Sequence, residues 1–395
     1  MQTLIELYDE RPLENVLGTE IFRPRKTVFV CMRDVAADTA LHRRIREHMQ
    51  ARGIDTELIF AGTDMFSPAK VLQTLRGITA VYPDCAVDIT GGTEAALFAA
   101  GLLSAEKEIP VFTYSRKQNR FFNITNAPFA DEAVCDVTYS VSESLSMAGG
   151  AMREGRVDNA VLDRYTEKIP EFFSLYLNNR AKWVRFIGYM QEASQDQKLR
   201  VEARRTLTAD HGARYTAPVE ILQGLEKIGW IRRLRFDEDT VRFTFLDEQV
   251  RAWTRDIGSV LELYVWLVCR DSGLFSDVQL SVVAEWGPGA AKDRNAVRNE
   301  IDVMMTAGVI PYFVSCKTGE IHTEALNELD VLRDRFGGQM AKAAIVSASR
   351  ANTAVRNRAF ELDIQVIDLD DLRYGKLDKQ LHTLVRTKKR RGTDQ

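Results

Sequence analysis

The fold of the C-terminal half of this 395-residue chain is decided by Asn299-Glu300-Ile301-Asp302-Val303 and, after a short turn, by Tyr312-Phe313-Val314-Ser315-Cys316-Lys317. Apolar Ile301, Val303 and Met305 alternate with acidic Glu300 and Asp302, which is the period of two expected of a strand. Thr306-Ala307-Gly308 supplies the turn, and Pro311 begins the second strand, where its missing N–H costs little. The pattern predicts a hairpin with acids and a lysine on one face.

The register of this hairpin decides which side chains meet. If Met305 lies near Ile310, Glu300 falls opposite Ser315, and Lys317 lies one step along on the same face. Carboxylates that bind a divalent metal, with an ammonium beside the attacking water, suit the hydrolysis of a phosphodiester. The other interpretation is a surface hairpin with an ordinary Glu–Lys cross-strand pair.

A second acid stands alone in an apolar helix. Residues 257–269 predict a helix that is apolar on nearly every side, with Glu262 as its only residue charged at neutral pH. An unpaired buried carboxylate is costly or shifts its pKa until it is neutral, so Glu262 needs a partner. A metal shared with Asp302 is one candidate, and a salt bridge to Arg255 or Arg270 is the other.

The order of these residues resembles the PD-(D/E)xK nuclease superfamily: Gly-x-x-x-Glu on a helix, then Glu-Ile-Asp, then Cys-Lys. The resemblance implies an α/β nuclease domain in which Glu262 and Asp302 bind Mg²⁺ or Mn²⁺ and Lys317 is the catalytic lysine. Ser315 stands where the family has its second acid. Glu285 or Glu300 is the candidate to supply the missing oxygen, and Glu300 joins the predicted catalytic set.

The N-terminal third alternates strands with helices. This alternation predicts a parallel sheet with both faces covered, whose ligands bind at the carboxyl ends of the strands. The predicted strands cover residues 3–7, 27–32, 56–60, 86–89 and 111–115, and the predicted helices cover 13–22, 39–52, 68–81 and 94–105. The fold class is therefore α/β in both halves of the chain.

One strand end carries a glycine pair, in Asp88-Ile89-Thr90-Gly91-Gly92-Thr93-Glu94. Glycines allow a ligand to approach the backbone closely, and the following helix offers free N–H groups to an anion. Thr90 and Thr93 are candidate hydroxyl donors to that ligand. The alternative is a tight strand–helix turn in which Thr93 only caps the helix.

With the loops at Asp9-Glu10-Arg11 and Ser115-Arg116-Lys117, this turn resembles the CRISPR-associated Rossmann-fold (CARF) sensor domains, over roughly residues 1–140. Joined to a PD-(D/E)xK domain, the whole chain resembles the cyclic-tetra-adenylate-activated effector nucleases of type III CRISPR systems. The resemblance implies a homodimer that cleaves DNA, RNA or both in antiviral defence. It implies a ligand site built from Thr90, Gly91, Gly92 and Thr93, with Asp9, Arg11, Arg33, Ser115 and Arg116 as further candidates.

The predicted domains are a sensor at 1–140, a helical and winged-helix-like connector at 141–250, the nuclease domain at 251–385 and a basic tail at 386–395. A helix at 218–229 and a hairpin at 230–235 and 240–245 form the winged-helix-like unit. We expect it to transmit sensor geometry, with DNA binding as the other interpretation. Arg232, Arg233 and Arg235 and the tail Lys388-Lys389-Arg390-Arg391 are candidate phosphate contacts. Aromatic residues at helical spacing within 157–192 indicate a core stripe.

Composition sets the outer limits. The chain is 45% hydrophobic and 28% charged with a formal net charge of −3, which is ordinary for a globular protein. No apolar run is long enough for a membrane span, and no signal peptide is evident, so we expect a cytoplasmic protein without a membrane partner. The five scattered cysteines predict reduced core residues. Two function classes remain: a ligand-gated, metal-dependent endonuclease, and a ligand-responsive nucleic-acid-binding regulator with an inactive nuclease-like domain.

Overall fold

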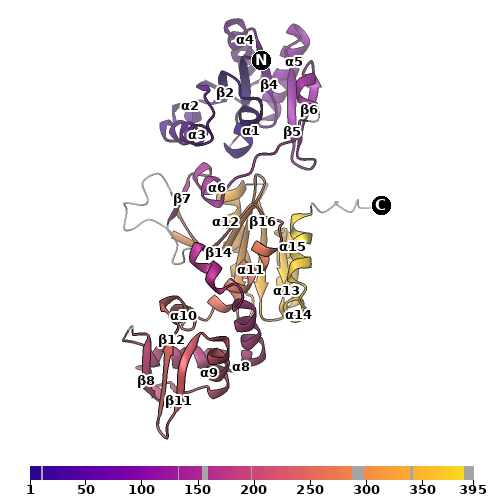
Figure 1. Ribbon diagram of the computed structural model, residues 1–395. Coiled ribbons are helices and arrows are strands. Elements are labelled where there is room, and N and C mark those ends of the chain that lie inside the picture. Colours follow the sequence, from indigo (N-terminus) through magenta and orange to yellow (C-terminus); the bar gives the residue numbers. More distant parts are fainter. Residues whose placement is uncertain are drawn as a thin grey trace.

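The computed structural model of the protein describes residues 1–9, 12–131, 133–153, 159–196, 198–286, 298–338 and 341–386. Figure 1 shows an N-terminal α/β domain at one end, a C-terminal α/β domain in the middle, and a smaller unit at the opposite end, here called the wing domain (residues 159–254). The predicted α/β fold class is confirmed. The wing domain follows the sensor in sequence but does not lie between the sensor and the C-terminal domain in space.

The N-terminal domain is a six-stranded sheet in the order β3-β2-β1-β4-β5-β6. Its first five strands are parallel, and β6 pairs with β5 in the antiparallel sense. The strands are β1 (Thr3–Leu7), β2 (Lys26–Met32), β3 (Glu57–Thr63), β4 (Cys85–Asp88), β5 (Val111–Ser115) and β6 (Arg120–Thr125). The helices are α1 (Pro12–Phe22), α2 (Arg33–Ala37), α3 (Thr39–Ala51), α4 (Pro68–Val81) and α5 (Glu94–Lys107), with a 3₁₀ turn at Pro128–Ala130.

Every strand and helix predicted for this domain is present, with ends displaced by a few residues at most. Strand β1 is buried along its whole length because it lies between β2 and β4 with helices on both faces. Helix α3 buries Leu41, Ile45 and Met49 at four-residue spacing, and Gly53, with φ of +65°, follows its end. Helix α2 and strand β6 are absent from the predicted set.

The C-terminal domain is a mixed six-stranded sheet in the order β17-β16-β15-β14-β13-β7. Its strands are β7 (Gly150–Arg153), β13 (Asp277–Trp286), β14 (Arg298–Ala307), β15 (Ile310–Lys317), β16 (Lys342–Ser347) and β17 (Ile364–Ile367). Its helices are α6 (Val141–Met147), α11 (Ser259–Asp271), α12 (Thr323–Gly337), α13 (Thr353–Glu361), α14 (Leu369–Arg373) and α15 (Leu377–Val385). Helices α11 and α15 pack on one face of the sheet, and α6, α12 and α13 pack on the other.

Residues 141–153, which the sequence assigns to the connector, contribute α6 and β7 to this domain. Strand β7 forms one edge of the sheet and pairs with β13, with Ala151 opposite Glu285. The side chains of Val141 and Leu145 in α6 join the core cluster of Ile301, Met304 and Phe313. The first part of the predicted connector is therefore structurally part of the C-terminal domain.

The predicted register of the β14–β15 hairpin is wrong by two residues. Met305 pairs with Tyr312 and Ala307 pairs with Ile310, so Met305 does not face Ile310. The reason is that the turn consists only of Gly308 and Val309, with Gly308 at φ of +59°, and β14 continues to Ala307. Because side chains alternate with a period of two, an error of two residues leaves each residue on its predicted face.

The wing domain contains α7 (Asn159–Leu162), a 3₁₀ turn (Asp163–Tyr165), α8 (Ile169–Ala193), α9 (Val219–Ile228) and α10 (Glu248–Trp253). Its strands are β8 (Arg200–Arg204), β9 (Thr206–Thr208), β10 (Arg214–Thr216), β11 (Ile231–Phe236) and β12 (Thr240–Phe245), and three of them form a sheet in the order β11-β12-β8. Residues 159–193 are largely helical, and α8 contains one residue, Asn179, whose φ and ψ are not helical. The aromatic residues of α8 are buried, which confirms their interpretation as a core stripe: Phe172, Phe173, Tyr176, Trp183, Phe186 and Tyr189.

Two predictions from composition can be compared with the described residues. All five cysteines are buried and free, as predicted. No helix in the described part of the chain has the length and apolar character needed to cross a bilayer. Glu10, Arg11 and the basic segment from 387 onward lie outside the described residues.

Candidate functional site

The acids predicted from sequence come together in one cleft between the wing domain and the C-terminal domain. Glu262 of α11 lines this cleft together with Glu300 and Asp302 of β14. Its remaining wall comes from α10, the start of α11 and β13: Gln249, Ala252, Trp253, Asp256, Ser259, Leu263, Leu280 and Ser281. Three of the four predicted catalytic residues therefore share one cavity.

Asp302 is held in place where β14 and β15 stop pairing. The ladder between these strands ends at Val303 and Val314. One residue further, the Cys316 backbone N–H donates to Asp302 Oδ2 at 2.6 Å, and the Ser315 hydroxyl donates to the same oxygen at 3.3 Å. Ser315, which stands at the position of the missing second acid, thus orients the first acid.

Glu262 lies one helical turn after Gly258, and the space beside the Glu262 carboxylate requires a glycine at position 258. A Cβ atom on Gly258 would lie 2.4 Å from Glu262 Oε1, so a larger residue there would displace the carboxylate. Asp256 precedes the helix, and its Oδ1 accepts the backbone N–H groups of Gly258 and Ser259, each at 2.9 Å. The Gly-x-x-x-Glu spacing therefore places the carboxylate over the first turn of α11.

The carboxylates in the cleft repel one another. Burial and the neighbouring acids, Asp302 first among them, raise the pKa of Glu262 to about 8. Burial also raises the pKa of Asp302, against the effect of the Cys316 N–H. Lys317, the last residue of β15, lowers the pKa of both groups, which places its positive charge near them.

The alternative salt bridge of Glu262 is not formed among the described residues. Arg270 binds Asp163 at 2.7 Å and Asp271 at 3.1 Å, and no ion pair joins Glu262 to Arg255. Of the two candidate replacements for the second acid, Glu300 lines the cleft, whereas Glu285 is buried opposite Ala151 and does not. Glu300 is therefore the better candidate for a third oxygen.

The donor set can be compared with the needs of a divalent metal. Among the described residues, no group of three His, Cys, Asp or Glu side chains surrounds one position. Mg²⁺ usually binds one or two protein carboxylates and completes its shell with water and substrate phosphates. Two repelling carboxylates in one cleft, Glu262 and Asp302, fit this pattern.

A second site lies at the carboxyl edge of the N-terminal sheet. Asp9, Arg33, Thr90 and Ser115 follow or end the strands β1, β2, β4 and β5, which are neighbours in the sheet. Parallel strands end at the same edge, so the structure brings these predicted residues to one side. Arg116 forms an ion pair with the buried Glu14 of α1, and Arg11 lies outside the described residues.

The threonine hydroxyls of the Thr-Gly-Gly-Thr turn are engaged within the fold. Thr93 Oγ1 donates to the Met65 carbonyl and accepts the Ala96 N–H at 3.3 Å, which confirms that Thr93 caps α5. Thr90 Oγ1 donates to Asp88 and accepts the Tyr114 N–H at 2.8 Å. Without rearrangement, neither hydroxyl is available for its predicted hydrogen bond to a ligand, and the backbone N–H groups of the turn are the stronger candidates.

The glycines of this turn are required by close packing. A Cβ atom on Gly91 would lie 2.6 Å from the Leu7 carbonyl oxygen and 2.7 Å from Asn15 Oδ1. Gly92 has φ of +90°, and a Cβ atom there would lie 2.9 Å from the Leu7 side chain. A substitution at either position would distort the turn itself, so it cannot separate ligand binding from folding.

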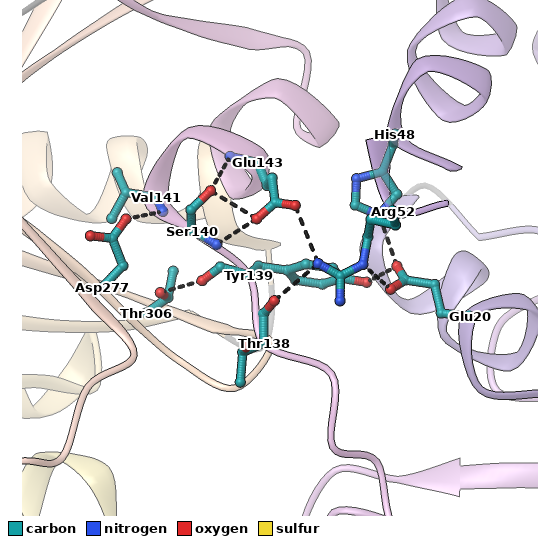
Figure 2. A network of polar contacts seen from close by, with 10 residues as sticks. All are labelled: Glu20, His48, Arg52, Thr138, Tyr139, Ser140, Val141, Glu143, Asp277 and Thr306. Carbon is teal, nitrogen blue, oxygen red and sulfur yellow. Dashed lines mark hydrogen bonds and ion pairs between the residues drawn. The ribbon is translucent and has the colours of Figure 1, made fainter. Parts of the chain in front are cut away.

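A polar network joins the N-terminal domain to the C-terminal domain (Figure 2). The buried Glu20 of α1 accepts hydrogen bonds or ion pairs from Tyr139 Oη (2.6 Å), His48 Nε2 (2.8 Å) and Arg52 Nε (2.6 Å). The Tyr139 backbone continues the network, because its carbonyl accepts the Thr306 hydroxyl and its N–H donates to Gly308 at 3.0 Å. Arg52 also donates to the Thr138 carbonyl and forms an ion pair with Glu143 of α6.

The tip of the β14–β15 hairpin belongs to the core of the N-terminal domain. Val309, which is 3% exposed, joins the cluster that contains Phe29, Phe112 and Tyr139. Burial, and then the charge of Glu20, raises the pKa of Tyr139 well above its usual range, so this hydroxyl remains a donor. The hairpin that carries Asp302 and Lys317 is therefore anchored in the other domain.

Comparison with known proteins defines the C-terminal domain. Residues 247–387 match the family described as Card1-like, endonuclease domain. The chain therefore carries a Card1-like endonuclease domain. Every acid of the cleft described above, and Lys317, falls within the matched residues of this domain. No curated protein sequence matches the chain.

Two solved structures share the fold of nearly the whole chain. Protein VC1899 from Vibrio cholerae is 18% identical, with a TM-score of 0.76, over 97% of this chain and 98% of that chain. Can2 from Sulfobacillus thermosulfidooxidans, in complex with cyclic tetra-adenylate, is 19% identical, with a TM-score of 0.70, over 98% of this chain and 99% of that chain. Together with the endonuclease-domain match, this likeness confirms the predicted fold, an N-terminal α/β domain joined to a nuclease domain.

Some residues of the cleft are absent from the predicted set. Asp256 could have been found, since an acid shortly before an apolar helix is an N-cap signal. Ser281 of β13 has φ of +51° and lines the cleft together with Asp302 of β14. No sequence pattern indicates this position of Ser281. Gln249 and Trp253 of α10 reach the cleft only because the wing domain packs against the endonuclease domain.

The raised pKa of Glu262 predicts a pH dependence of stability in metal-free protein. Between about pH 4.3, the unfolded value, and pH 8, the folded state keeps a proton that the unfolded state has lost, so stability falls as pH rises. In EDTA, the free energy of unfolding should fall less for Glu262→Gln than for the wild type between pH 6 and pH 8. The difference between the two losses should be about 2 kcal/mol at most. Urea denaturation with Glu320→Gln as an exposed control measures this, and equal losses in all three proteins would contradict it.

Proposed function

We propose that the protein is a metal-dependent endonuclease that a cyclic oligoadenylate activates. The observation that carries this proposal is the meeting of Glu262 and Asp302 at one cleft within the Card1-like endonuclease domain, with the positive charge of Lys317 acting on both carboxylates. Two mutually repelling carboxylates and one lysine form the minimum set for hydrolysis of a phosphodiester. The PD-(D/E)xK resemblance assigns the same three residues.

Each residue of the cleft has a defined task in this proposal. Glu262 and Asp302 would hold Mg²⁺ or Mn²⁺, which stabilises charge on the phosphate and lowers the pKa of a bound water. The Cys316 N–H and the Ser315 hydroxyl fix the direction of the Asp302 carboxylate. The Lys317 ammonium orients the attacking water, and Glu300 is available as a further oxygen on the rim of the cleft.

The catalytic assignment predicts a loss of turnover without a loss of folding. Lys317→Ala should reduce cleavage of labelled DNA and RNA about a hundredfold or more in Mn²⁺, a typical loss for an oriented catalytic group. Lys379→Ala, an exposed lysine of α15, is the matched control. EDTA should abolish cleavage by the wild type. Wild-type rates for Lys317→Ala, or full activity in EDTA, would remove the proposed mechanism.

The carboxyl edge of the N-terminal sheet is the proposed ligand site. The solved Can2 structure contains cyclic tetra-adenylate, and its fold matches this chain almost end to end. The turn at 90–93 leads into the N-terminus of α5, which favours an anionic group. A cyclic ligand of near-twofold symmetry suits a site shared by two copies of the chain, so we propose a homodimer.

Arg33 offers a test of this site that leaves the turn intact. It is exposed at the carboxyl end of β2, where its charge would attract phosphates. Arg33→Glu should weaken binding of cyclic tetra-adenylate at least about tenfold in calorimetry. Arg46→Glu, exposed further along α3, makes the same charge change and should bind as the wild type does. Equal affinity in both variants would place the ligand elsewhere.

Activation requires that ligand binding change the endonuclease domain, and the hairpin anchored in the sensor provides a route. Helix α1 has Glu14 at the ligand edge, paired with Arg116, and Glu20 at the opposite end, in the interdomain network. Tyr139 contacts both Glu20 and Thr306. Thr306 is four residues from Asp302 in β14. A ligand acts through this route only by binding one arrangement more tightly than the other.

Tyr139→Phe tests this route, because it removes one hydroxyl from the network and little else. The ratio of cleavage with cyclic tetra-adenylate to cleavage without it should fall about five- to tenfold, in keeping with typical coupling energies. Tyr165→Phe is the matched control, since Tyr165 donates to Asp247 at the same 2.6 Å but within the wing domain. An unchanged ratio in Tyr139→Phe, or an equal fall in both variants, would overturn the route.

A further inference from the structure

We propose that the outward face of the β11-β12-β8 sheet binds the phosphodiester backbone of the nucleic acid that enters the cleft. This inference rests on the proposed endonuclease function and adds a binding surface outside the domain that carries the acids. The wing domain would then hold the substrate strand, and its position beside the cleft would be explained by that task.

Alternation along the three strands separates a core face from a charged face. Val201, Phe243 and Ile231 point into the core. The exposed residues between them lie on the other face, and the ladder pairs them across the sheet. One row across β11, β12 and β8 is Arg232, Thr244 and Arg200. The next row is Arg235, Arg242 and Glu202. In a third row, Thr240 of β12 lies opposite Arg204 of β8. Neighbouring strands are about 4.8 Å apart, so five guanidinium groups share one small surface.

Four of these five arginines have no ionic partner within the described residues. The nearby acids, Glu202 and Asp237, both bind Arg242, at 2.9 and 2.7 Å. Arg200, Arg204, Arg232 and Arg235 form no ion pair in the part of the chain that the structure describes, and like charges on one face repel. The chain as a whole has a net charge of −3, so this positive surface is a local concentration.

The backbone of β11 contains a strained arginine beside this surface. Arg233 is exposed with φ of +58°, in a bulge between the pairs of Arg232 and Arg235, and such a position usually belongs to glycine. The bulge is fixed by Glu226 of α9, which accepts the Leu234 N–H at 2.8 Å. A charged side chain kept at a position that favours glycine indicates a function for the charge.

The positive charge of the winged-helix-like unit lies on its sheet and not on its helix α9. The exposed residues of α9 are Glu220, Gln223, Glu226 and Lys227, and Glu220 forms an ion pair with Lys182. An acidic helix is poorly suited to enter a groove of DNA. Arginines spread over a sheet contact phosphates and carry no base sequence, so the surface should bind without sequence preference.

One end of the charged surface lies next to the helix that lines the cleft. Arg200 and Arg232 lie at the end of the sheet where β12 leads into α10, and α10 supplies Gln249, Ala252 and Trp253 to the cleft wall. The acidic turn that contains Glu238 and Asp239 lies at the opposite end. Figure 1 shows α10 between this sheet and the endonuclease domain. A strand bound along the sheet is thus led toward Glu262 and Asp302.

The test measures binding by full-length protein that carries Asp302→Asn, so that cleavage does not interfere. Fluorescence anisotropy with labelled 40-nucleotide single-stranded DNA, duplex DNA and RNA, with and without cyclic tetra-adenylate, gives affinity as a function of NaCl. Substituting four arginines with glutamine should weaken binding about tenfold or more. The slope of log affinity against log salt should fall by about 3, since each single-strand phosphate contact contributes about 0.7. The four are Arg200, Arg204, Arg232 and Arg235.

A matched control removes four exposed arginines elsewhere, with the same change in net charge: Arg25, Arg43, Arg46 and Arg373. A second variant, Arg233→Gly, suits the positive φ of the bulge, so it should keep or raise the unfolding midpoint while binding weakens about two- to fivefold. If the role of Arg233 is only structural, Arg233→Gly will leave the affinity for nucleic acid unchanged.

The proposal is overturned if the parent protein binds none of the three nucleic acids, or if the sheet variant binds like the matched control. It is also overturned if Arg233→Gly and the sheet variant both keep the parental salt slope. The nucleic acid with the largest loss identifies the substrate class that the surface holds. Because binding is measured in a cleavage-deficient protein, failure here leaves the metal and lysine experiments unaffected, and failure of those leaves this result standing.

Discussion

A carboxylate removed from water needs a partner of opposite charge or several hydrogen bonds, and this constraint organises the link between the domains. Glu14 and Glu20 are both buried in α1 and lie six residues apart, about 9 Å along the helix. Glu14 is satisfied by Arg116 near the carboxyl edge of the sheet, and Glu20 by Arg52 and Tyr139 at the opposite end. Neither end can move freely, because separating a pair would leave a buried charge alone. The helix therefore connects the two edges of the sensor as one rigid element.

The β14–β15 hairpin continues this connection into the endonuclease domain. Its tip is buried in the N-terminal core through Val309, and its Thr306 binds the Tyr139 carbonyl. Asp302 lies four residues further along β14, about 13 Å away at the rise of a strand. A central strand packed on both faces transmits displacement instead of absorbing it. The wing domain lies at the opposite end of the molecule, so the proposed route does not pass through it (Figure 1).

The sequence predicts the helices and strands, and the face on which each residue lies, better than it predicts which residues are neighbours in space. The acids of β14 are found because strand alternation survives a register error of two residues, and Glu262 is found because it is the only charge in an apolar helix. The register itself depends on a two-residue turn at Gly308, which the sequence leaves open. Ser281 and Trp253 could not be found, since their position at the cleft arises from packing between elements distant in the chain. The engagement of Thr93 by the Met65 carbonyl has the same origin.

Among the described residues, two departures from local consistency lie on either side of α10. In the cleft, carboxylates are gathered closely enough to raise the pKa of Glu262 to about 8. On the wing sheet, four arginines are gathered without an ionic partner among the described residues, and Arg233 adopts a strained φ. Proteins depart from internal consistency mainly at functional sites, where a ligand completes the interactions. A nucleic acid would complete both: its phosphates neutralise the arginines, and together with a divalent cation they supply the charge balance that the carboxylates lack. The two departures have opposite signs, and a single polyanion with its cation would satisfy both.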